Sequence, residues 1–222
     1  MLKYKMNILL IFILTLCTFT FVNAEEQKLK GKIIYLDAGH GGIDPGAMYR
    51  EIKESEINLQ ITNELKKELE KQGATVYQTR IGDYDLSKIN TKNHKRNDLE
   101  TRAQLINDSN CDIYISIHLN SDPSPTWNGT QVFYTNKNEQ NKIIAENLQK
   151  QFKEELKIKR ELKQLKNMYL FDRIKKPGIL IEAGFISNPN DRYKLKQPKY
   201  QQQMAEIITK GIIKYYEQYK KQ

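Results

Sequence analysis

The chain has 222 residues, 28% of them charged, and a formal net charge of +9 at pH 7. This length is enough for one domain with a substantial core, and two cysteines are too few for a disulfide framework, so the fold depends on packing. Lysines and arginines alternate with glutamates, and no nucleic-acid recognition motif accompanies them. The missing motif, together with the export signal described next, argues against nucleic acid and favours an anionic extracytoplasmic polymer as partner.

Residues 1–24 have the pattern of a secretory signal peptide. Two lysines precede an apolar run over residues 8–22, and a small-residue cleavage site ends at Ala24. An uncleaved membrane anchor is the alternative, because the apolar run is only just shorter than the roughly 20 residues that cross a bilayer. We therefore expect an exported protein with one folded domain over residues 30–220, which contacts a membrane only through the N-terminal segment.

Apolar periodicity predicts strands and helices that alternate along the rest of the chain. The predicted strands cover residues 32–37, 74–79, 112–118, 129–134 and 178–182. The predicted helices cover residues 55–72, 97–109, 139–156 and 199–219. This alternation predicts an α/β fold in which a twisted, largely parallel, mixed sheet is flanked by helices on both faces.

Three residues with useful chemistry follow buried strands directly. His40 lies in a glycine-rich turn after the first strand, His118 ends the third, and Glu182 ends the last. Sheets of this kind bind ligands at the carboxyl ends of their strands. Asp37 could accept the second ring proton of His40 and so favour metal binding. Each residue also has a simpler interpretation.

The simpler interpretations are structural. A histidine can hydrogen-bond locally within its turn or donate to a backbone carbonyl, and Glu182 can form a salt bridge with Arg80 or Arg102. A catalytic zinc site uses three ligands from His and carboxylate side chains and leaves a fourth position for water. Glu51, Glu54 and Glu56 are all candidates for the third ligand, because all lie near the start of the first helix, and composition alone does not choose among them.

Six ordered motifs resemble those of the zinc-dependent N-acetylmuramoyl-L-alanine amidases of bacterial cell walls, over residues 32–219. The motifs are Asp37-Ala38-Gly39-His40-Gly41-Gly42 with Asp44-Pro45-Gly46-Ala47, Glu54-Ser55-Glu56-Ile57-Asn58-Leu59, Thr79-Arg80, Arg102-Ala103-Gln104-Leu105-Ile106-Asn107, Ser116-Ile117-His118-Leu119-Asn120-Ser121, and Pro177-Gly178-Ile179-Leu180-Ile181-Glu182-Ala183-Gly184-Phe185-Ile186-Ser187-Asn188. Ala38 stands where the family often has Pro or another small residue.

The resemblance implies an enzyme with a zinc exopeptidase-like fold. It implies Zn²⁺ held by His40, Glu54 and His118, with Glu182 as the catalytic carboxylate. The implied reaction cleaves the amide between N-acetylmuramic acid and L-alanine in peptidoglycan. A zinc carboxypeptidase acting on wall peptides, and a non-catalytic wall- or partner-binding protein, are the alternatives.

Within the family, the chain resembles the spore-cortex amidases of endospore formers, because a single catalytic domain directly follows an export signal. That resemblance implies a role in cortex maturation, through formation of muramic-δ-lactam, and in germination. It places the protein in the cell wall or in the intermembrane space of the forespore. Since no wall-binding repeat is visible, we also expect an accessory protein that activates the enzyme.

Overall fold

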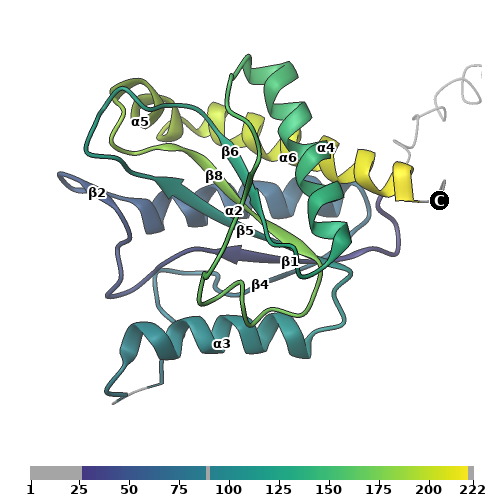
Figure 1. Cartoon of the computed structure of the whole chain (residues 1–222), viewed down its shortest axis with the longest axis horizontal. Helices are drawn as coiled ribbons and strands as arrows, with labels where there is room; N and C mark the ends of the chain where they lie inside the picture. The colour runs from purple at the N-terminus through teal and green to yellow at the C-terminus, as the bar shows by residue number, and fades with distance from the viewer. Residues whose placement is uncertain (1–26, 89–90, 220–222) are drawn as a thin grey trace, which may run out of the picture.

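The computed structural model describes residues 27–88 and 91–219 (Figure 1). The predicted signal peptide lies outside these residues. Within them, eight strands are present: β1 (Ile33–Ala38), β2 (Met48–Tyr49), β3 (Ile52–Lys53), β4 (Thr75–Gln78), β5 (Ile113–Asn120), β6 (Gln131–Tyr134), β7 (Lys163–Gln164) and β8 (Gly178–Phe185). Six form one sheet in the order β4-β1-β5-β8-β6-β7, and β2 and β3 form a separate short hairpin.

The sheet is mixed, as predicted. The strands β4, β1, β5 and β8 are parallel, whereas β6 runs antiparallel to β8 and carries β7 parallel to itself. The four parallel strands therefore have their carboxyl ends at one edge. Strand β8 continues to Phe185, three residues beyond the predicted end at Glu182, because Phe185 pairs with Asn120 after an irregularity in β5.

Five helices flank the sheet in the described residues: α2 (Glu54–Lys71), α3 (His94–Asp108), α4 (Glu139–Leu156), α5 (Pro189–Leu195) and α6 (Pro198–Tyr219). On α2, the apolar residues spaced by four are all buried, which explains why the helix packs through one face: Ile57, Ile61, Leu65 and Leu69. Helices α2, α4 and α6 share the larger core with one face of the sheet. The predicted α/β fold is thus confirmed.

Gly211, in the middle of α6, marks a close helix contact. A Cβ atom at this position would lie 2.8 Å from Leu148 Cγ on α4. Glycine there costs intrinsic helix stability, but it allows α4 and α6 to pack closely. The helix therefore continues through Gly211 to Tyr219.

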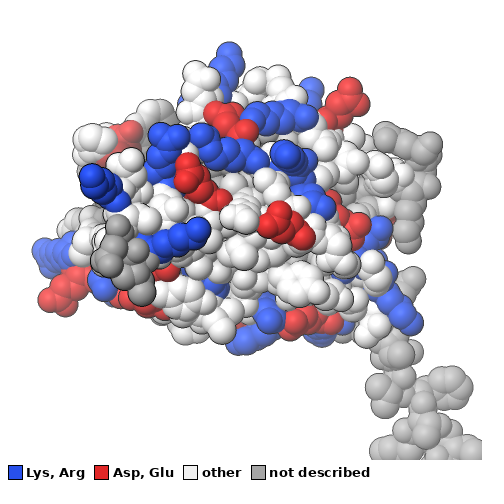
Figure 2. All heavy atoms as spheres, turned by 90° about the horizontal axis from the view of Figure 1, so that it is seen from below, with Lys and Arg blue, Asp and Glu red and all other residues white. Residues whose placement is uncertain are grey.

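Helix α3 covers the opposite face of the sheet. Ala103 and Ile106 pack there with Tyr35, Tyr114 and Leu180 in a second, smaller core. Figure 2, seen from the side of α3, shows lysine and arginine side chains beside aspartates and glutamates, so charges of both signs are mixed on this face. In the part of the chain that the structure describes, no helix is long and apolar enough to span a membrane.

Candidate active site

His40 lies in the turn after β1 and has a left-handed backbone conformation, with φ of 62°. Two backbone hydrogen bonds between Gly41 and Asp44, of 2.8 and 3.1 Å, close this turn. As a result, the Asp44 carboxylate lies 2.9 Å from His40 Nδ1, and His40 Nε2 lies 3.3 Å from Glu54 Oε1. A carboxylate on one ring nitrogen fixes the ring and makes the other nitrogen a better metal ligand.

The prediction that Asp37 orients the His40 ring is wrong. Asp37 is fully buried and accepts hydrogen bonds from the hydroxyls of Thr79 and Ser116, at 2.8 and 2.7 Å, and from Arg102, at 2.8 Å. Burial by itself raises a carboxyl pKa, but the charges of Arg102 and His118 and the hydrogen bonds from Ser116 and Arg102 outweigh it and lower the pKa of Asp37. Asp44 was not among the predicted residues, although a carboxylate four residues after a turn histidine was a usable signal.

Arg102 holds the backbone of the His40 turn from α3. It donates hydrogen bonds of 2.7 Å to the carbonyl oxygens of Ala38 and His40. Its guanidinium also forms ion pairs of 2.8 Å with Asp37 and Asp98, and its side chain is only 1% exposed. The cation therefore links the end of β1 to α3, with every contact inside the protein.

We expect Arg102→Met to destabilise the fold by roughly 3–5 kcal/mol, because it leaves two buried carboxylates without their cation. The free energy of unfolding in urea measures this effect. Arg96→Met is the matched control, since Arg96 lies on the exposed side of the same helix and pairs with Glu100. Equal urea midpoints of unfolding for the two variants would show that the contacts of Arg102 contribute no stability.

Glu54, the first residue of α2, lies between the two histidines. Its Oε1 is 3.1 Å from His118 Nδ1 and accepts the backbone N–H of Leu119 at 3.0 Å, while Oε2 accepts the N–H of Ala47 at 2.8 Å. Burial raises the pKa of a carboxyl, but the hydrogen bonds and charges of His118 and His40 outweigh it and hold the Glu54 pKa far below its usual range. Glu54 is therefore ionised and fixed in place.

The structure separates Glu54 from the other two carboxylates near the start of α2. Glu54 is 3% exposed, whereas Glu51 and Glu56 are exposed to solvent, and Glu56 pairs with Lys53. Gly46 makes room for the buried carboxylate, because a Cβ atom there would lie 2.6 Å from Glu54 Oε2. Only Glu54 is placed to act with the histidines.

His118 comes from β5, beside the end of β1. Its ring lies over Gly39, where a Cβ atom would be only 2.2 Å from the imidazole, so the absence of a side chain at this position lets the ring approach. The rings of His40 and His118 are nearly perpendicular, with centroids 4.9 Å apart. Both histidines therefore present a ring nitrogen to the Glu54 carboxylate.

The three side chains fit the requirements of a metal site. His40, Glu54 and His118 each offer one ligand atom, and these atoms lie within 4.8 Å of one another. Two imidazoles and one carboxylate are a donor set that catalytic zinc sites use. In the described residues the group has three members, which is the number of protein ligands that catalytic zinc sites use beside a water.

Glu182, on β8, is directly beside His118 in the sheet register. Its Oε2 atom is buried and has no hydrogen-bond partner among the described residues, so the alternative of a salt bridge to Arg80 or Arg102 is wrong. Burial raises the pKa of Glu182 to about 7, because it disfavours the charged carboxylate. A carboxyl group of this kind can accept and donate a proton near neutral pH.

Comparison with known families identifies the chain. A family model described as N-acetylmuramoyl-L-alanine amidase matches residues 34–214. The chain belongs to this amidase family. It is 41% identical, over 215 residues, to the germination-specific N-acetylmuramoyl-L-alanine amidase of Bacillus subtilis, a match that covers 93% of this chain and 91% of the relative. The resemblance drawn from the six motifs is confirmed.

Solved amidase structures have the same fold. The CwlD amidase from Clostridioides difficile, determined in complex with the GerS lipoprotein, has a TM-score of 0.80 and 35% identity, and the match covers 84% of this chain and 99% of that one. The catalytic domain of the amidase CwlV from Bacillus (Paenibacillus) polymyxa has a TM-score of 0.73 and 26% identity, with 84% and 98% covered. The sheet and helices described above are thus those of an amidase.

Proposed function

We propose that the protein is a zinc-dependent enzyme that hydrolyses the amide between N-acetylmuramic acid and the L-alanine of the stem peptide. One observation carries this proposal. The buried, unpartnered Glu182 Oε2 is beside His118, and His118 belongs to the group of three potential metal ligands. Hydrolysis at a metal centre needs such a ligand set and a neighbouring proton acceptor. Family membership supports the choice of bond.

The residues divide into two tasks. His40, Glu54 and His118 hold the metal, which, when bound, acidifies a water molecule and polarises the amide carbonyl. Glu182 takes a proton from the attacking water and passes it to the leaving nitrogen of L-alanine. In the metal-free protein, burial raises the pKa of Glu182 to about 7, so its carboxylate and acid forms are both populated near neutral pH. Asp44 keeps the His40 ring in its binding orientation.

Digestion of purified peptidoglycan tests metal dependence and bond choice together. We expect new free amino groups on L-alanine and intact glycan strands, no cleavage after treatment with a chelator, and recovery when Zn²⁺ is added back. Release of single residues from free peptide carboxyl ends would identify a carboxypeptidase. Absence of any product with zinc present would favour a non-catalytic binding protein.

We further propose that residues 1–24 export the protein, that residues 30–220 form the catalytic domain, and that the substrate is spore-cortex peptidoglycan. The germination-specific name of the Bacillus subtilis relative supports the last point. Cortex from spores that lack the gene should contain no muramic-δ-lactam. Unchanged lactam content would exclude the role in the cortex.

The CwlD–GerS complex supports the proposal of an accessory protein. Adding this protein should raise the zinc retention or the activity of the purified enzyme.

A further inference from the structure

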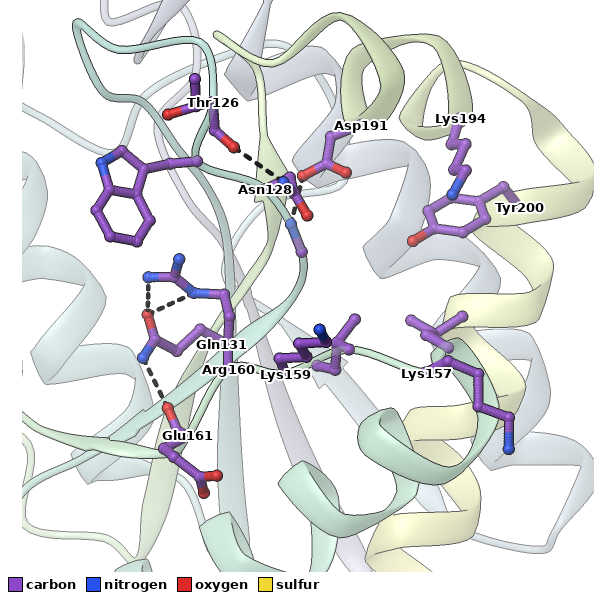
Figure 3. A pocket seen from close by; sticks show the side chains of 14 residues that line it. Thr126, Asn128, Gln131, Lys157, Lys159, Arg160, Glu161, Asp191, Lys194 and Tyr200 are labelled. Carbon is purple, nitrogen blue, oxygen red and sulfur yellow. Dashed lines mark hydrogen bonds between the residues drawn. The ribbon is translucent and has the colours of Figure 1, made fainter.

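A pocket of about 820 Å³ lies next to β6, outside the group formed by His40, Glu54, His118 and Glu182 (Figure 3). Its walls come from the loop before β6, from Gln131 of β6, from the last residue of α4 and residues 157–161 after it, and from Asp191, Lys194 and Tyr200 of α5 and α6. The mechanism proposed above uses none of these residues. The pocket therefore needs its own explanation.

Sheet pairing connects the pocket to the active site. Gln131, in the pocket wall, pairs with Glu182 across β6 and β8, and Glu182 pairs with His118 across β8 and β5. Directly paired residues put their side chains on the same face, with Cβ atoms about 5 Å apart. Gln131, Glu182 and His118 therefore form a row, which places one wall residue of the pocket a single strand away from Glu182.

Figure 3 shows Arg160 beside Gln131, on one side of this pocket. Its Nε and Nη2 donate to the side-chain oxygen of Gln131 at 3.0 and 2.6 Å. Gln131 is itself fixed, because its amide nitrogen donates to the backbone oxygen of Glu161 at 2.7 Å. The guanidinium carbon also lies 5.5 Å from the ring centre of Trp127 and 4.9 Å from that of Phe185. These contacts orient the cation but do not neutralise it.

The pocket has an excess of positive charge. Its two carboxylates are already engaged: Glu161 pairs with Lys153, and Asp191 accepts the backbone N–H groups of Gly129 and Phe185. Four cations line the pocket, and none of them forms an ion pair with a carboxylate in the described part of the chain: Lys157, Lys159, Arg160 and Lys194. A fixed guanidinium without a carboxylate partner is a ready site for a ligand carboxylate.

We propose that this pocket binds a free carboxylate of the peptidoglycan stem peptide, with Arg160 as the residue that contacts it. The inference rests on the proposed amidase function, which places the stem peptide beside Glu182. The peptide carries free carboxylates, whereas the sugar rings of the glycan offer mainly neutral hydroxyl and acetamido groups. The exposed Trp127 ring, 54% accessible, provides an apolar surface beside the guanidinium for the peptide chain.

The test uses two muropeptide substrates that share glycan and scissile bond. One keeps its stem carboxylates free, and in the other they are converted chemically to methylamides. We expect wild type to prefer the free substrate by roughly ten- to hundred-fold in kcat/KM, mainly through KM, since the contact is remote from the reacting bond. Arg160→Gln should abolish this preference, because it lowers kcat/KM only for the substrate whose stem carboxylates are free. Arg160→Lys, which keeps the charge, should restore part of it.

Lys30→Gln is the charge-matched control, because Lys30 is exposed and precedes the amino end of β1, at the opposite edge of the sheet. It should leave the preference unchanged. Equal losses on both substrates in Arg160→Gln, with a wild-type melting temperature, would overturn the inference but leave the amidase function standing. If wild type cleaves neither substrate with zinc present, the proposed function itself fails. Equal kcat/KM of wild type for both substrates would also overturn the inference.

Discussion

Replacing Glu182 by Gln is expected to lower kcat by a factor of about 10² to 10⁴, while zinc content stays at the wild-type level. The reason is that Gln keeps the size of the side chain but cannot accept a proton from water. Glu182 is not among the three grouped metal-binding candidates, so its loss should not release the metal. Turnover of purified peptidoglycan and metal analysis of the same sample measure both quantities.

Stability gives a second readout for Glu182 that does not depend on turnover. Burial raises its pKa to about 7 from an ordinary value of 4.5, so the folded state resists ionisation above pH 4.5 more than the unfolded chain does. At pH 8 the charged carboxylate therefore destabilises the metal-free fold. Glu182→Gln should raise the melting temperature of the metal-free protein at pH 8, and this gain should shrink toward pH 4.5.

The exposed Glu51 provides the control for this prediction. Glu51→Gln removes one carboxylate near the same edge of the sheet and should change neither kcat nor the melting temperature. Near-normal turnover of Glu182→Gln would exclude Glu182 as the proton acceptor. Loss of zinc along with activity would instead indicate that Glu182 contributes to holding the metal.

The convergence of His40, His118 and Glu182 was predictable because parallel strands place their carboxyl ends at one edge. Buried apolar runs identify such strands, and each of these residues comes at or just after the end of such a run, although β5 and β8 continue to Asn120 and Phe185. Topology alone was thus enough to predict that these three residues lie together. The sequence also predicted which face of α2 and of α6 is buried, since apolar residues recur there at helical spacing.

The identity of the supporting groups was not predictable from spacing. Asp44 reaches the His40 ring because His40 adopts a left-handed conformation, and a glycine-rich segment permits many backbone paths. Choosing Glu54 over its neighbours depended on family motifs, because only the exact start of α2 decides which carboxylate turns inward. The basic segment that ends at Arg160 has no periodic pattern, so its place beside β6 follows from tertiary contacts alone.

Replacing His40, Glu54 or His118 by Ala is expected to reduce bound zinc and activity together, which distinguishes these residues from Glu182. The proposed metal site has three protein donors, so each substitution would remove one of the three. Zinc content after dialysis against a weak chelator, measured alongside turnover, tests this prediction. Full zinc occupancy in all three variants would overturn the assignment of these residues as ligands.

Glu54→Ala should have the most complex effect of the three, because Glu54 also accepts the backbone N–H groups of Ala47 and Leu119. Its loss leaves buried donors unsatisfied, so we expect a lower melting temperature as well as less zinc. Glu56→Ala is the matched control, since Glu56 lies two residues further on the same helix but is exposed. A loss of zinc confined to Glu54→Ala would show that α2 contributes one carboxylate to the site. Equal losses of zinc in both variants would show that the start of the helix, and not the Glu54 carboxylate, determines zinc binding.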